Sequence, residues 1–106
     1  MNHAGTILNE IRRLANKMFG DREAFVYLYG SRARGNATND SDWDLLIVTD
    51  DAISSKDDFE RFAFPFAEIG WKYGEQITPL LYTKSQWEAE RGTVFHQNVE
   101  TEAILI

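Results

Sequence analysis

The sequence of 106 residues contains no cysteine. Disulfides, thiolate zinc sites and cysteine nucleophiles are therefore excluded, and a small chain without disulfides is typical of a reducing compartment. No apolar run approaches the length of a membrane span, and the first residues lack the basic and apolar regions of a signal peptide. We expect a cytoplasmic protein with no membrane association.

Positive charge is also scarce, because 11 lysine and arginine residues stand against 17 acidic residues, which gives a formal net charge of −6. Such a chain repels polyphosphate backbones at long range, and this argues against strong nonspecific nucleic-acid binding. Small phosphorylated ligands are still compatible with the charge if a metal ion bridges ligand and protein.

Hydrophobic residues make up 43% of the sequence, enough for one core, and neither a repeat nor a linker divides it. We predict a single domain over residues 1–106. Apolar residues at helical spacing predict helices at 6–19, 56–71 and 93–103, with a short helix around Trp87. Compact apolar runs predict strands at 24–29, 44–48 and 76–82. This order predicts an α/β (α+β) fold, a small mixed β-sheet packed against helices.

Only two prolines occur, and each marks a boundary. Pro65 predicts a kink or a break in the helix at 56–71, for which Ser54 or Ser55 is the expected N-cap. Pro79 predicts that its strand is an edge strand or contains a bulge. Residues 104–106 are apolar and are expected to pack last.

Two aspartates open the second predicted strand. Asp42 and Asp44 are separated by one residue, so their side chains point to the same face of the sheet. Carboxylate oxygens suit Mg²⁺ or Mn²⁺, and Mg²⁺ commonly takes one or two carboxylates plus substrate phosphates. The pair predicts a site for one divalent cation or two.

A glycine and a serine end the first predicted strand. Gly30 lets the backbone approach a ligand closely, and free N–H groups with the Ser31 hydroxyl are able to hold phosphate oxygens. Arg32 and Arg34 add cationic donors. With the two aspartates, this arrangement favours a nucleoside triphosphate whose α-phosphate lies at the metal site, where in-line attack is feasible.

Three residues of this stretch also have a structural interpretation. Ser31 suits a helix N-cap. Arg34 suits an ion pair with Asp40 or Asp42 that braces the loop. Trp43 lies between the two aspartates of its strand, so it is expected to face the core.

The pattern Gly30-Ser31, ten residues, then Asp42-x-Asp44 and an apolar strand resembles the signature of the DNA polymerase beta-like nucleotidyltransferase superfamily. Residues 30–35 and 41–46 are similar to its minimal nucleotidyltransferase branch. The resemblance implies the polymerase beta-like fold, triphosphate contacts from the Gly-Ser pair, and three carboxylates that hold two Mg²⁺ ions. When Thr78-Pro79 is aligned with the later strand of the family, Glu75 takes the position of the third carboxylate.

Small members of this branch are often paired with a HEPN-type toxin. The resemblance therefore implies an antitoxin that transfers AMP from ATP to a hydroxyl group on the side chain of such a partner. An inactive nucleotidyltransferase fold that binds and neutralises or positions a partner is the alternative from another class. A small-molecule adenylyltransferase is a third possibility. The sequence leaves the oligomeric state open.

Overall fold

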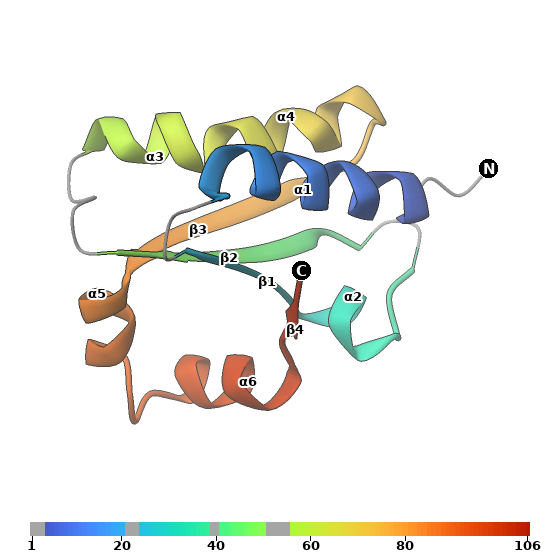
Figure 1. The fold of residues 1–106 in the computed structure, drawn as a ribbon. Coiled ribbons are helices and arrows are strands. Elements are labelled where there is room, and N and C mark those ends of the chain that lie inside the picture. Colours follow the sequence, from blue (N-terminus) through green and yellow to red (C-terminus); the bar gives the residue numbers. More distant parts are fainter. Residues whose placement is uncertain (1–3, 21–23, 39–40, 51–55) are drawn as a thin grey trace.

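A four-stranded mixed sheet lies between two layers of helices (Figure 1). The structure is a computed structural model, and it describes residues 4–20, 24–38, 41–50 and 56–106. In chain order the elements are α1 (Ala4–Phe19), β1 (Phe25–Tyr29), α2 (Ser31–Arg34), β2 (Trp43–Thr49), α3 (Lys56–Phe62), α4 (Phe64–Lys72), β3 (Ile77–Thr83), α5 (Lys84–Ala89), α6 (Val94–Glu102) and β4 (Ile104–Leu105). This architecture confirms the predicted fold class.

The strands lie in the order β3-β2-β1-β4. β1 pairs antiparallel with β2 and with β4, whereas β2 and β3 run parallel. β3 is thus an edge strand, as Pro79 predicts, because a proline cannot donate a hydrogen bond to a further strand. Two strand pairings position Asp44 in the site described below. Asp44 lies opposite Tyr29 in β1 and opposite Thr78 in β3.

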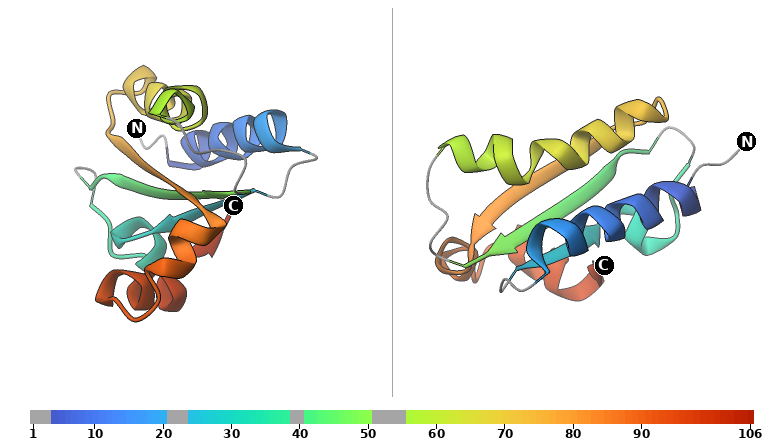
Figure 2. Two further views of the ribbon diagram at one scale, coloured as in Figure 1. Left: turned by 90° about the vertical axis from the view of Figure 1, so that its left-hand side faces the viewer. Right: turned by 45° about the horizontal axis from the view of Figure 1, so that its top comes forward.

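Helices cover both faces of the sheet (Figure 2). α1, α3 and α4 pack on one face over the larger core, to which Leu45 and Ile47 of β2 belong. α5 and α6 lie on the other face, where Leu46 and Val48 pack with Val99 of α6. Because β2 is buried on both faces, its sequence is a continuous apolar run rather than an alternating one.

Several element boundaries differ from the sequence predictions. The predicted helix at 56–71 is broken at Ala63 into α3 and α4, with Pro65 in the first turn of α4, where a missing N–H costs nothing. Residues 104–105 form β4 instead of packing inside, and the side chains of Ile104 and Leu105 are exposed. Ser54 and Ser55, the expected N-caps, lie outside the described residues. Across the described ranges, no helix combines the length and the apolar character needed to cross a membrane.

Candidate functional site

The antiparallel register of β1 and β2 brings the Gly-Ser turn against the second aspartate. Gly30 follows Tyr29, which pairs with Asp44. The backbone of Gly30 has φ 77°, a conformation that L side chains rarely adopt. A Cβ atom built on Gly30 would lie 2.4 Å from Oδ2 of Asp44. Both observations require glycine, and they place the two halves of the sequence motif in direct contact.

The polar segment after Gly30 begins with a short helix, which is not among the helices predicted from the sequence. α2 starts at Ser31 and ends at Gly35, whose φ of 81° gives it the left-handed C-cap conformation. Gly30 itself is the N-cap residue, and no side-chain hydrogen bond caps the helix. Ser31 is therefore not the N-cap, and its half-buried side chain lies in the first turn, beside the Gly30 backbone.

Asp44 has a perturbed ionisation. Its carboxyl group is half-buried, whereas Asp42 is exposed at the residue before β2. Burial raises the pKa of Asp44, and the negative charges of Asp42 and Glu102 raise the pKa further, while Arg34 opposes them. A concentration of negative charge at a half-buried carboxylate is the electrostatic condition under which a bound cation is most stabilising.

Trp43 separates the two aspartates in sequence and occupies the larger core, as predicted, with 3% of its surface exposed. Its indole Nε1 donates to Oε1 of Glu75 over 3.0 Å. Nη2 of Arg32 donates to the same oxygen over 3.0 Å, and the Arg32 guanidinium stacks 4.6 Å from the centre of the Trp43 ring. Glu75 is therefore fixed on the Trp43 side of the sheet.

The structure does not bring Glu75 together with Asp42 and Asp44. Side chains alternate along β3, and Thr78 is the residue of β3 that lies opposite Asp44. Glu75 precedes β3, and its carboxylate accepts from Arg32 and Trp43 instead. Within the ranges that the structure describes, no three acidic or histidine residues are grouped so that they could hold a metal ion. Of the three carboxylates predicted to hold metal, only Asp42 and Asp44 thus lie together, and the metal role of Glu75 stays a prediction.

Arg34 pairs with a residue that sequence reasoning missed. Its Nη1 donates to both oxygens of Glu102, over 3.2 and 3.0 Å, and the backbone N–H of Gly30 donates to Oε1 of Glu102 over 3.1 Å. Glu102 ends α6, 72 positions from Gly30, and the sequence holds 17 acidic residues. No local signal singles it out. Of the two partners predicted for Arg34, Asp40 lies outside the described residues, and the pair with Asp42 is replaced by one with Glu102.

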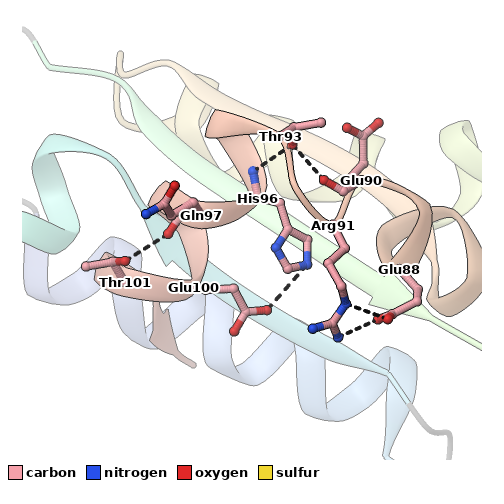
Figure 3. Close-up of polar contacts among 8 residues, drawn as sticks. All are labelled: Glu88, Glu90, Arg91, Thr93, His96, Gln97, Glu100 and Thr101. Carbon is pink, nitrogen blue, oxygen red and sulfur yellow. Dashed lines mark hydrogen bonds and ion pairs between the residues drawn. The ribbon is translucent and has the colours of Figure 1, made fainter.

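A hollow of about 380 Å³ at the turn between α5 and α6 forms a separate polar region. Figure 3 shows the polar contacts among the residues of this turn. Thr93 caps α6 by accepting from the backbone N–H of His96. His96 is buried and stacks against Trp87, and its Nε2 lies 3.6 Å from Oε1 of Glu100. These contacts are local to the helix pair, and none of the predicted site residues lines the hollow. His96 is thus a packing residue.

The fold and the Gly30–Asp44 contact define a nucleotidyltransferase-like domain. Residues 9–105 match the family described as "Polymerase beta, Nucleotidyltransferase". The chain belongs to this family, which confirms the superfamily resemblance of the motif.

Two proteins of Methanocaldococcus jannaschii are similar to the chain. "Putative protein adenylyltransferase MJ0604" is 31% identical over 99 residues, 93% of this chain and 92% of the relative. "Putative protein adenylyltransferase MJ1305" is 33% identical over 76 residues, 71% of this chain; the match spans about half (52%) of that relative. The structure is also similar to a chain of a solved structure described as "Crystal structure of the toxin-antitoxin with AMP-PNP", with a TM-score of 0.61 and 18% identity over 92% of this chain and 69% of that one. At this identity the likeness concerns the fold.

Proposed function

We propose that this nucleotidyltransferase binds ATP with Mg²⁺ and transfers AMP to a hydroxyl group on a partner protein. The single observation that carries the proposal is the contact between Gly30 and Asp44, because it joins a candidate phosphate-binding turn to a candidate metal carboxylate. In the reaction the acceptor oxygen forms a bond to the α-phosphorus, the bond from this phosphorus to the bridging oxygen breaks, and pyrophosphate leaves. The hydroxyl proton passes to solvent.

The donor set suits Mg²⁺. Asp42 and Asp44 offer only carboxylate oxygens, Asp42 is exposed, and Asp44 is half-buried with a raised pKa. Mg²⁺ commonly binds one or two carboxylates together with substrate phosphates, and when bound it neutralises charge at the reacting phosphate. Gly30, Ser31 and Arg34 bind and orient the triphosphate in this proposal. Arg32 and Glu75 act as positioning residues, because they fix the core side chain of Trp43, which separates the two aspartates in sequence.

A protein acceptor is supported by the names of the two archaeal relatives, one of which the chain matches over almost its full length. The description of the structural neighbour supports a place in a toxin–antitoxin pair and a nucleotide ligand. We infer that the partner is a HEPN-type toxin and that the chain acts as its antitoxin. The net charge of −6 favours association with a basic partner.

A second candidate function is favoured by the position of Glu75. With Glu75 bonded to Arg32 and Trp43, only two of the three carboxylates predicted to hold metal, Asp42 and Asp44, lie together in the described site. An inactive nucleotidyltransferase fold that neutralises or positions its partner by binding alone would account for this.

The test is to purify the protein with whatever copurifies from its own host and to add Mg²⁺ and ATP labelled at the α-phosphate. We expect covalent label on a partner with the wild type and with the control E68Q, which removes an exposed carboxylate from α4. We expect no label with the double variant D42N/D44N. Undiminished labelling by the double variant contradicts the metal role of the aspartates. An intact partner that stays unlabelled with all four triphosphates supports the binding module.

A further inference from the structure

Glu102 accepts hydrogen bonds from the very groups to which the proposed function assigns the triphosphate. Its carboxylate receives the backbone N–H of Gly30 over 3.1 Å and the guanidinium of Arg34 over 3.0 and 3.2 Å. A carboxylate and a phosphate oxygen pair are alike in charge, and both accept two hydrogen bonds from an arginine. The same donors cannot serve both anions at once.

We propose that Glu102 is a further residue of this site, which occupies its phosphate-binding donors in the absence of nucleotide and is displaced when a triphosphate binds. The inference rests on the proposed function. It makes Glu102 an internal competitor, so the measured affinity for nucleotide is lowered by the fraction of molecules in which Glu102 holds the donors.

The contacts around Glu102 explain why its side chain is able to leave without unfolding. The backbone on either side is fixed: the N–H of Ala103 bonds to the carbonyl of Val99, and Ile104 of β4 pairs with Leu28 of β1. The side chain keeps 20% of its surface exposed, so it has a path to solvent. Displacement is therefore a rotation of one side chain at the end of α6.

Charge at the site also favours an exchange of anions. Glu102 contributes a negative charge beside Asp44, where Asp42 supplies another, and Arg34 is the cation set against them. A triphosphate that arrives with Mg²⁺ brings its own compensating charge, which the carboxylate of Glu102 does not. The wild-type site exchanges one anion for another that is better neutralised.

The test compares the binding of Mg²⁺–ATP to four proteins by titration calorimetry: the wild type, E102A, E102Q and the control E100Q. E102A frees both donors, and E102Q keeps the size of the side chain in case the shorter variant does not fold. E100Q removes the same charge from the same helix, at a side chain directed to His96 (Figure 3). We expect E102A to bind about tenfold more tightly than the wild type, E102Q to lie between them, and E100Q to match the wild type.

A second titration with adenosine, which has no phosphate, separates displacement from a general change in the fold. We expect the same adenosine affinity in all four proteins. If ATP binds the wild type but binds E102A and E102Q no more tightly, Glu102 does not compete, and the inference is overturned while the proposed function stands. Equal tightening in E100Q also overturns it, because long-range charge then explains the effect. If none of the four binds ATP, the proposed function fails, and the inference with it.

Discussion

Replacing Gly30 by alanine tests the contact that joins the two halves of the site. The substitution has two costs. The first is the backbone at φ 77° and ψ −158°, a region that is essentially restricted to glycine and costs an L residue about 1–3 kcal/mol. The second is the new Cβ atom, which would lie 2.4 Å from Oδ2 of Asp44 and would force that carboxylate out of its rotamer, for about 1 kcal/mol more. We expect G30A to lower the free energy of unfolding by about 2–4 kcal/mol, equivalent to a fall in Tm of about 10 °C or more.

Two matched variants separate the costs. Gly35 has φ 81° and ψ 11°, the milder left-handed conformation, and a Cβ atom there meets nothing within 4 Å, so G35A carries only a backbone cost and sets a lower reference for G30A. In a D44A background the carboxylate is gone and the nearest remaining atom, Cβ of residue 44, lies at an ordinary 3.5 Å. The effect of G30A in that background should therefore fall to its backbone cost alone, which gives a coupling energy of about 1 kcal/mol between Gly30 and Asp44.

The assay is urea unfolding followed by tryptophan fluorescence, to which the buried Trp43 contributes a signal from the core beside the site. The reasoning is refuted if G30A costs no more than G35A, or if the cost of G30A is unchanged when Asp44 is alanine. Either result would mean that the Gly-Ser turn and the aspartate are not in contact.

Three further predictions concern stability. G70A should cost about 1–3 kcal/mol in urea unfolding, because its Cβ atom would lie 2.8 Å from Cγ1 of Ile77; an unchanged midpoint would contradict that packing. The hydrogen bond from Lys72 is the main cause that lowers the pKa of Glu10, so E10Q should lose up to about 1 kcal/mol at neutral pH. The loss should vanish as pH falls through the folded pKa of Glu10, and a difference that persists in acid would refute the assignment. T93A should cost about 1 kcal/mol by thermal unfolding, whereas T93S, which keeps the capping hydroxyl, should not.

The fold class followed from local patterns because most of its elements are encoded locally. The amphipathic spacing of α1 reflects burial on one face, and the apolar run of β2 reflects burial on both faces. Pro65 and Pro79 marked a helix break and an edge strand through their missing N–H groups. β4 was missed because two exposed residues carry no periodicity, and their pairing with β1 is a tertiary event.

In the candidate site too, residues close in sequence were predictable and tertiary contacts were not. Gly30 and Asp44 were predictable together because one hairpin carries both. Glu75 was aligned by a sequence pattern, but it lies before β3, and its hydrogen bonds with Arg32 and Trp43, which decide where its carboxylate points, are tertiary contacts. Glu102 could not be found, since its contact with Gly30 depends on the path of α6 across the sheet.

The hairpin that carries the site has a consequence for the order of folding. Gly30 and Asp44 are close in sequence, with only α2 and one polar segment between them, so the entropy lost in bringing them together is modest, and the β1–β2 pairing is among the contacts expected to form early. Glu102 lies 72 positions from Gly30, and its contact closes a far longer loop. During synthesis, which proceeds from the N-terminus, the phosphate-binding turn is made before the glutamate that neutralises it. A nascent chain would therefore display this turn to solvent, or to a nucleotide, before its own carboxylate is available.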